Sequence, residues 1–293
     1  MVATDSPRVA VVIPCFNDGA TLSSAMESAR RQGEPVELVV VDDGSTDSRT
    51  VERIAAVEAA GATVVRQPNS GPGAARQNGL RHTKAPYVLP LDADDVLRPD
   101  VLGALAAALD ANPRAAAAWG WYERFGDEST LQQTARHLDP WQLTYQNDLP
   151  ATALLRRAAL EDVGGWDVSN GYEDWALWLS LADAGWEGVG LPRVVYSYRR
   201  EGVRLAHRDV ARHDALVEAL AARYPRLWAQ RRHNWRRSRA PLAVRLALPA
   251  IGVLPLSGDR RRLLGRAVNE LAQGRGVGVL VRRVREQHWA PRG

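Results

Sequence analysis

In the stretch Leu89-Pro90-Leu91-Asp92-Ala93-Asp94-Asp95, three carboxylates directly follow an apolar strand. Folding does not require this arrangement, because like charges at a strand end repel and their desolvation is costly unless a cation or hydrogen-bond donors compensate. Mg²⁺ and Mn²⁺ prefer such oxygen ligands and often share them with substrate phosphates. An acidic turn before a helix N-terminus explains the same residues, and Asp95 is assigned to the helix that follows. The stretch therefore predicts a cation site or a capped turn at a strand end.

Short apolar strands alternate with helical patterns on both sides of that stretch. Strands are predicted at 8–15, 37–41, 63–66 and 86–91. Helices are predicted at 21–32 and 99–110, and two further helices are predicted to end at 60 and at about 82. This alternation indicates βαβ units and a parallel sheet. Ligands bind beyond the carboxyl ends of such strands, so we expect the site where 14–19, 42–47 and 92–95 meet.

The pattern is looser in the second half of the chain. Strands are predicted at 115–122, 152–156 and 189–198, a Trp- and Leu-rich helix at 172–184, and an amphipathic helix at 209–223. A domain boundary is expected near 200–208.

The cysteine content fits a reducing compartment, and hydropathy predicts neither a signal peptide nor a membrane-spanning helix. The single cysteine, Cys15, cannot form an internal disulfide. The N-terminus does not read as a signal peptide, and no run of about eighteen apolar residues is present. We therefore expect a cytoplasmic protein. The basic C-terminal region described below adds the expectation of peripheral contact with the inner face of the membrane.

Charge is distributed unevenly along the chain. Residues 1–200 contain 18 Lys and Arg against 27 Asp and Glu, a net charge of −9, whereas residues 201–293 contain 20 against 7, a net charge of +13. Arginine clusters flank the apolar segment 240–256, and such alternation suits an anionic membrane surface at 226–293. Two other interpretations explain the same charges. Lys84 is the only lysine, so arginine is simply the cation that this chain uses, and charged helix faces are usually just solvated. Without a recognisable nucleic-acid-binding module, nucleic acid is not an expected partner.

Several motifs, in this order and spacing, resemble family 2 glycosyltransferases of the GT-A fold. The resemblance covers about residues 8–200 and is carried by Val-Ile-Pro-Cys-Phe-Asn at 12–17, Val-Val-Asp-Asp-Gly-Ser-Thr-Asp at 40–47, Asn-Ser-Gly-Pro-Gly-Ala-Ala-Arg-Gln-Asn-Gly at 69–79, Leu-Asp-Ala-Asp-Asp at 91–95, Gly-Gly-Trp-Asp at 164–167 and Glu-Asp-Trp at 173–175.

The resemblance implies an α/β fold with a Rossmann-like, mostly parallel sheet flanked by helices and a helical C-terminal extension. Residues 1–205 would form the catalytic domain, with a nucleotide-binding half at 1–98 and an acceptor half at 99–205, followed by the basic, mostly helical region 206–293.

The implied activity is transfer of a sugar from a nucleotide-diphosphate donor to a hydroxyl acceptor, with inversion and with Mn²⁺ or Mg²⁺. UDP is the expected carrier, while TDP and GDP stay open, and the acceptor is a glycan, a lipid-linked glycan or a small molecule. The Gln-x-x-Arg-Trp motif of polymerising members is absent, since 230–235 does not fit it, so transfer is expected to be non-processive.

Donor-binding residues follow from the matching motif positions. Asp43 would accept the imide N–H of the base, Arg76 would meet phosphate or ribose oxygens, and Asp92 a ribose hydroxyl or a metal-bound water. Asp94 would bind the metal, with Asp92 and the late His207 as further candidate ligands. Asp42 reads as a turn-capping residue. The remaining donor-binding candidates are Pro14, Phe16, Asn17, Gly71 and Gly73.

The acceptor-side motif supplies the expected base. The resemblance assigns proton abstraction to Asp174 and positioning of acceptor or base to Glu173, although acids in a first helical turn are also favoured by the helix dipole. Trp166 and Trp175 are expected near the acceptor or sugar, while at least half of the seven tryptophans between 119 and 186 are expected in the core.

Two other functions are weighed against sugar transfer. A nucleotidyltransferase would need a Gly-rich phosphate loop after the first strand, where this chain has Pro-Cys-Phe-Asn-Asp-Gly at 14–19. A catalytically inactive sugar-nucleotide-binding module would be favoured by loss of Asp94 or Asp174, and both are present.

Overall fold

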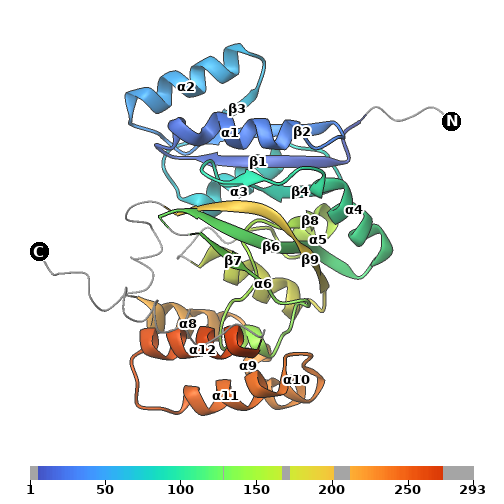
Figure 1. Cartoon of the computed structure of the whole chain (residues 1–293), viewed down its shortest axis with the longest axis vertical. Helices are drawn as coiled ribbons and strands as arrows, with labels where there is room; N and C mark the ends of the chain where they lie inside the picture. The colour runs from blue at the N-terminus through green and yellow to red at the C-terminus, as the bar shows by residue number, and fades with distance from the viewer. Residues whose placement is uncertain (1–5, 128, 167–171, 201–211, 273–293) are drawn as a thin grey trace, which may run out of the picture. The chain divides into compact units, whose positions relative to one another are not determined.

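The computed structural model describes residues 6–127, 129–166, 172–200 and 212–272 (Figure 1). The chain forms two compact units. The first comprises Met1–Leu138 and Asp148–Arg204, and the second comprises Asp139–Asn147 and Leu205–Gly293. Among the described residues, no helix combines the length and the apolar character needed to cross a membrane.

The first half of the first unit is a parallel sheet in the order β3-β2-β1-β4. The sequence-based strands and helices here are confirmed to within about three residues at each end, apart from the starts of the second and third helices, for which no bound was predicted. The observed bounds are β1 Val9–Cys15, α1 Gly19–Arg30, β2 Val36–Asp42, α2 Ser48–Ala59, β3 Thr63–Arg66, α3 Pro72–Arg81 and β4 Tyr87–Pro90.

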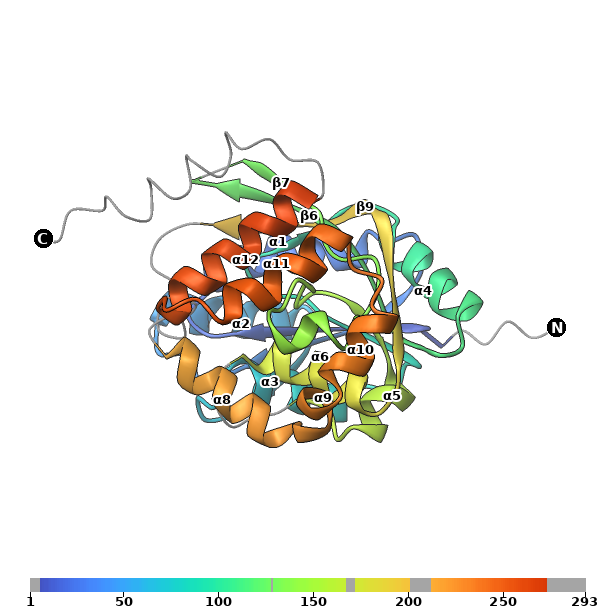
Figure 2. The same cartoon turned by 90° about the horizontal axis from the view of Figure 1, so that it is seen from below.

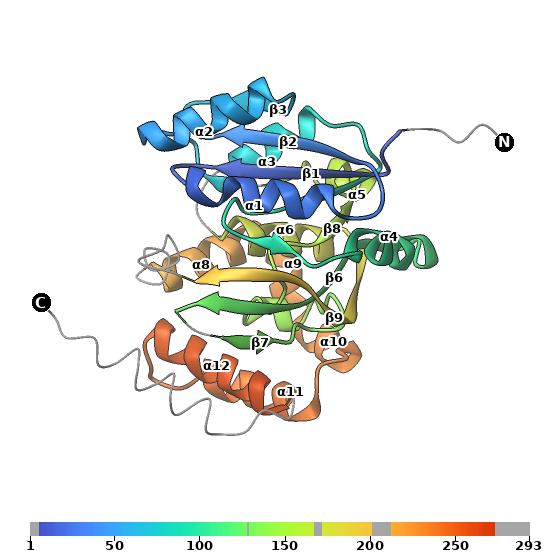
Figure 3. The same ribbon diagram turned by 45° about the horizontal axis from the view of Figure 1, so that its top comes forward.

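Helices α1 and α3 cover opposite faces of this sheet (Figure 3). Because side chains alternate along a strand, Ile13 of β1 packs in one core cluster with Leu22 and Met26 of α1. Val12 points to the other face, where Gly79 of α3 approaches so closely that a Cβ on this glycine would lie 2.2 Å from Val12 Cγ1. Helix α3 also carries Arg76, Gln77 and Asn78, which contact residues of the site.

The second half of the first unit continues the sheet in the order β4-β8-β6-β9-β5, with β7 paired to β6. Here β6 and β9 run parallel, while β8, β5 and β7 pair antiparallel with their neighbours. The element bounds are β5 Val96–Leu97, α4 Val101–Ala111, β6 Ala115–Gly126, β7 Thr130–Gln132, β8 Leu154–Arg156, α5 Arg157–Asp162, α6 Glu173–Asp183 and β9 Glu187–Arg200.

The second unit is helical in its described part. It contains η1 Gln142–Thr144, α8 His213–Arg223, α9 Pro225–Ala229, α10 Arg231–Arg237, α11 Leu242–Gly252 and α12 Gly258–Ala272. Helices α11 and α12 lie side by side (Figure 2). Trp141 forms this unit's core cluster with Val244 and Leu248.

One short segment of the second unit comes from the middle of the sequence. Asp139 Oδ1 accepts hydrogen bonds from the backbone of Trp141 and Gln142, and Oδ2 accepts from the Ser238 hydroxyl and the Arg239 N–H. The segment is thereby tied to the connection between α10 and α11, 99 and 100 residues later, which no local pattern indicates.

Candidate active site

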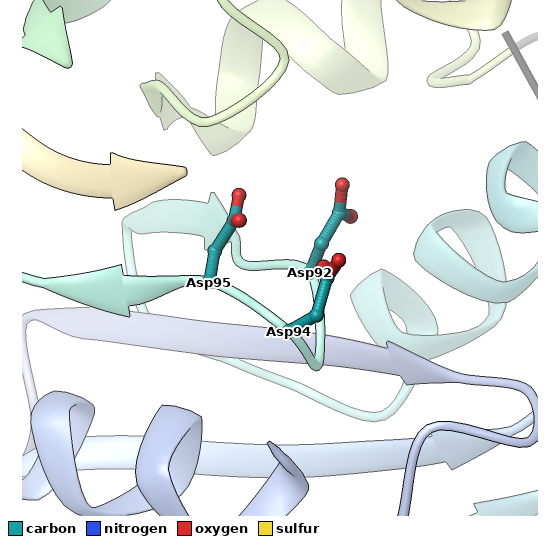
Figure 4. Close-up of side chains that lie close together, drawn as sticks. All are labelled: Asp92, Asp94 and Asp95. Carbon is teal, nitrogen blue, oxygen red and sulfur yellow. The ribbon is translucent and has the colours of Figure 1, made fainter. Parts of the chain in front are cut away.

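Three carboxylates gather where β4 ends. Candidate ligand oxygens of Asp92, Asp94 and Asp95 all lie within 4.8 Å of one another. Their side chains rise from the same side of one loop (Figure 4). Such an all-oxygen donor set fits Mg²⁺ or Mn²⁺.

The assignment of Asp95 to a helix N-terminus is wrong. Strand β5 follows it directly, and α4 begins only at Val101. The buried Asp95 Oδ1 instead accepts a hydrogen bond from the Arg199 N–H at 3.1 Å, which joins the loop after β4 to the end of β9. The local sequence could not show this, because the partner lies 104 residues away.

The two aspartates at the end of β2 have different local roles. Asp42 Oδ1 accepts from the Ser45 N–H at 2.9 Å, which confirms its turn-capping role. Asp43 is buried and accepts from Gln67 Nε2 at 2.7 Å, Ser70 N at 2.8 Å and Gly71 N at 2.9 Å. A carboxylate has about four acceptor positions, so one remains for a nucleobase, and base recognition by Asp43 stays a prediction.

The loop after β1 is tied to the loop after β2. Asn17, with a positive φ of 61°, accepts from the backbone N–H groups of Thr46 and Asp47 through Oδ1. Pro14 lies in β1, and the ring of Phe16 is exposed at the carboxyl end of that strand. The three candidate residues of this segment therefore lie at the strand edge where nucleoside binding was predicted.

Glycines begin the helix that follows β3. Gly71 has φ of 87° at the N-terminal flank of α3, where a left-handed backbone suits glycine, and Gly73 is buried in the first turn. Because Gly71 N already binds Asp43, this turn is held at the end of β2.

Arg76 does not present a free guanidinium. Its side chain is 4% exposed, with Nη2 2.7 Å from Asp92 Oδ1 and Nη1 2.7 Å from Glu173 Oε1. One buried arginine thus joins the end of β4 to the start of α6. Direct contact of Arg76 with the donor stays a prediction.

Glu173 and Asp174 begin α6, and their environments differ. Burial, followed by the charge of Glu173, raises the pKa of Asp174 to about 6, against smaller opposing effects of the Trp175 backbone N–H and Arg76. A carboxylate with such a pKa is ionised near neutral pH and is a stronger base than an exposed one. This is the property that proton abstraction from a hydroxyl requires.

The aromatic candidates are buried. The backbone N–H of Trp166 donates to Gln77 Oε1 at 2.9 Å, and Trp166 and Trp175 are each 4% exposed. Trp119, Trp141 and Trp178 are also buried, which confirms that at least half of the seven tryptophans belong to the core. Asp167 and His207 lie outside the described residues, so the metal-ligand prediction for His207 is untested.

Three amide side chains were missed by sequence reasoning. Gln67 receives a hydrogen bond from Asn78 Nδ2 at 2.8 Å and donates to Asp43, while Gln77 accepts from Trp166. A Cβ on Gly165 would lie 1.9 Å from Gln77 Oε1, so the 164–166 turn approaches α3 closely. Gln77 and Asn78 directly follow Arg76 in the 69–79 motif, which was the available signal, whereas Gln67 lies outside any motif.

Comparison with known proteins gives a family match over more than half of the chain. The profile described as "Glycosyl transferase family 2" matches residues 10–164. An uncharacterized glycosyltransferase of Mycobacterium tuberculosis is 32% identical over 204 residues, covering 66% of this chain and 87% of the relative. The succinoglycan biosynthesis protein ExoU of Rhizobium meliloti is 39% identical over 107 residues, covering 36% of this chain. This chain spans 31% of that relative's length.

Solved structures share the architecture at low sequence identity. The mannosyltransferase PcManGT from Pyrobaculum calidifontis, solved with GDP-Man and Mn²⁺, has a TM-score of 0.61 and 20% identity, covering 98% of this chain and 82% of that one. S. aureus TarS, solved with UDP-GlcNAc, has a TM-score of 0.60 and 18% identity, covering 90% and 81%. These likenesses confirm the GT-A fold that the sequence predicted.

Proposed function

Because this chain belongs to glycosyltransferase family 2, we propose that it is a metal-dependent, inverting and non-processive enzyme that moves a sugar from a nucleotide diphosphate to a hydroxyl acceptor. The observation that carries the proposal is that one buried arginine links a cluster of acidic oxygens to the helix start that bears a buried carboxyl. Asp92 and Glu173, which neighbours Asp174, bind the same arginine side chain.

The chemical step is a single displacement. Asp174 accepts the proton of the acceptor hydroxyl while that oxygen bonds to the anomeric carbon of the donor sugar. The bond from this carbon to the diphosphate oxygen breaks, and the nucleoside diphosphate leaves with that electron pair. Attack opposite the leaving group inverts the anomeric centre, and a base so placed typically contributes ~10²–10⁴-fold.

The residues at the end of β4 suit a hard divalent cation. Asp94 would hold the metal, with Asp92 as second ligand, because both carboxylates are half-buried and lie in the same oxygen cluster. The bound cation would neutralise the charge that develops on the departing diphosphate. Asp95 is engaged by the Arg199 backbone and serves to fix the loop.

The nucleoside would lie at the edge formed by the ends of β1 and β2, against Phe16 and Asp43. UDP remains the proposed carrier from the family resemblance, with TDP and GDP as the alternatives. Relatives named for succinoglycan biosynthesis support a role in polysaccharide or cell-envelope assembly, with a glycan or lipid-linked glycan as acceptor.

The test is a calorimetric titration of UDP, TDP and GDP into the full chain, with and without Mn²⁺. We expect one nucleotide to bind in a Mn²⁺-dependent manner, and Asp94→Ala to abolish this binding. Asp127→Ala, at an exposed carboxylate outside the acidic cluster, is the matched control and should bind as wild type. Binding of no nucleotide, or equal binding by Asp94→Ala, would contradict the proposed function.

The second unit is proposed to contact an anionic membrane surface, which would bring the enzyme to a lipid-linked acceptor. Leu242 and Leu246 lie one turn apart on α11 and are 63% and 59% exposed, and Val253 at its end is 83% exposed. Exposed arginines of α10 precede this apolar ridge at positions 232, 236 and 237. Apolar side chains for insertion and cations for anionic headgroups are the two components of interfacial binding.

A further inference from the structure

Helix α3 contacts three parts of the site through three consecutive side chains. Arg76 binds Asp92 and Glu173, Gln77 accepts from the Trp166 backbone, and Asn78 donates to Gln67, which in turn donates to Asp43. The donor edge and the α6 side of the site are therefore tied to one turn of one helix.

Arg76 occupies the central position in this arrangement. Its side chain is almost fully buried, and its Nε is also buried and lacks a hydrogen-bond partner within the described part of the chain. Burial alone would lower the pKa of Arg76, but the charges of Asp92 and Glu173 and their hydrogen bonds raise it above its usual value. The guanidinium is thus a permanent cation held between two anions.

The two anions belong to different parts of the proposed reaction. Asp92 lies in the acidic cluster after β4, and Glu173 directly precedes Asp174 in the first turn of α6. A planar guanidinium can hold two carboxylates at fixed directions through separate nitrogens, which a point-like ammonium cannot do. If either carboxylate is displaced, the ion pair between Arg76 and the other carboxylate changes in strength.

We propose that Arg76 is a positioning residue that couples the cation and donor site at Asp92 to the proton-accepting end of α6 at Glu173. This inference rests on the proposed function. With Glu173 bound, Arg76 shares its charge between two carboxylates and leaves Asp92 available to the cation. By reciprocity, cation and donor binding at Asp92 would fix Glu173, and with it Asp174, for transfer.

The coupling is tested by a double-mutant cycle on nucleotide affinity, measured by calorimetry with Mn²⁺ and the nucleotide that wild type binds. Glu173→Gln lies on the acceptor side, yet it should weaken this binding by about fivefold or more, because Arg76 then pairs with Asp92 alone. Glu58→Gln removes the same charge from an exposed ion pair with Arg66 and should leave affinity unchanged.

Arg76→Lys keeps the positive charge, so a purely Coulombic role predicts unchanged affinity, whereas loss of the two-sided bridge predicts weaker binding. In the Arg76→Lys background, Glu173→Gln should change affinity by no more than about twofold, the limit of additivity for independent sites. Arg81→Lys, at an exposed arginine of the same helix, is the matched control.

Each result decides between clear alternatives. If wild type binds no nucleotide with Mn²⁺, the proposed function fails and the coupling fails with it. If wild type binds but Glu173→Gln has the same effect in both backgrounds, or none, the coupling alone is wrong. Circular dichroism shows whether Arg76→Lys folds. If it does not, the two single variants Glu173→Gln and Glu58→Gln decide: a nucleotide affinity of Glu173→Gln equal to that of Glu58→Gln and wild type overturns the inference.

Discussion

At the scale of single residues, the buried carboxyl of Asp174 predicts a specific pH dependence. Its pKa is raised to about 6, so the ionised base is lost as pH falls through this value. Transfer measured as kcat/KM should be constant above that pH and fall about tenfold per pH unit below it. Asp174→Asn should remove this acid limb and lower transfer by ~10² or more.

Nucleotide binding is the control for that substitution. Asp174→Asn changes a group on α6 that makes no proposed donor contact, so Mn²⁺-dependent nucleotide affinity should stay within about threefold of wild type. Full transfer activity in Asp174→Asn would show that another group takes the proton.

Whether the role of a site residue could be predicted depends on how near its hydrogen-bond partner lies in the sequence. The cap of Asp42 on Ser45 could be predicted because the turn lies within four residues. The role of Asp95 could not be predicted. An aspartate suits a helix start, but here it is buried and accepts a hydrogen bond from the backbone of β9. The donor contact of Arg76 stays a prediction. Its two carboxylate partners, Asp92 and Glu173, could not be predicted because they lie 16 and 97 residues away along the chain.

At the scale of elements, the close contact between α3 and β1 predicts a position that does not tolerate a methyl group. In Gly79→Ala, the added Cβ would lie 2.2 Å from Val12 Cγ1 and 3.1 Å from Val41 Cγ2. Overpacking of this kind typically costs about 1–3 kcal/mol, so the midpoint of thermal unfolding should fall. Because α3 carries Arg76, Gln77 and Asn78, nucleotide affinity should fall as well.

The matched control lies within α4. In Gly103→Ala the nearest atom is Glu34 Oε1 at 3.6 Å, an ordinary contact, and alanine is the better helix former by about 0.8–1.0 kcal/mol. The midpoint should therefore stay equal or rise. A thermal midpoint of Gly79→Ala at or above wild type would contradict the packing described for α3.

Strands and helices of the parallel sheet were predictable because continuous apolar runs and helical periodicity are local signals. The long strands β6 and β9 were underpredicted: β6 extends to Gly126 and β9 to Arg200, both beyond the apolar residues that marked them. Their polar ends pair with each other, and pairing partners more than 70 residues apart leave no local pattern.

At the scale of the whole molecule, the exposed ridge of α11 predicts measurable membrane binding. Full-length protein should pellet with phosphatidylcholine vesicles that contain phosphatidylglycerol, and less at high salt, because ionic screening weakens the arginine contribution. Leu246→Glu should weaken binding about tenfold or more, since burying one leucine side chain is worth roughly 1.5–3 kcal/mol.

Leu131→Glu is the control for the membrane prediction. Leu131 is an exposed leucine of β7 in the first unit, so the same change of charge and polarity should leave vesicle binding unaffected. Equal binding by Leu246→Glu and wild type would contradict the assignment of α11 as the docking element.

The only cysteine gives the protein a built-in chemical reporter. Cys15 ends β1, is 1% exposed, and burial raises the pKa of its thiol to about 12. Since alkylating reagents attack the thiolate, the closed chain would be almost inert to them, and labelling would record openings of the strand end beside Phe16 and Asn17. The alkylation rate of this sulfur thus measures how often the ends of β1 and β2 open. Ligands that hold these strand ends closed would lower the rate.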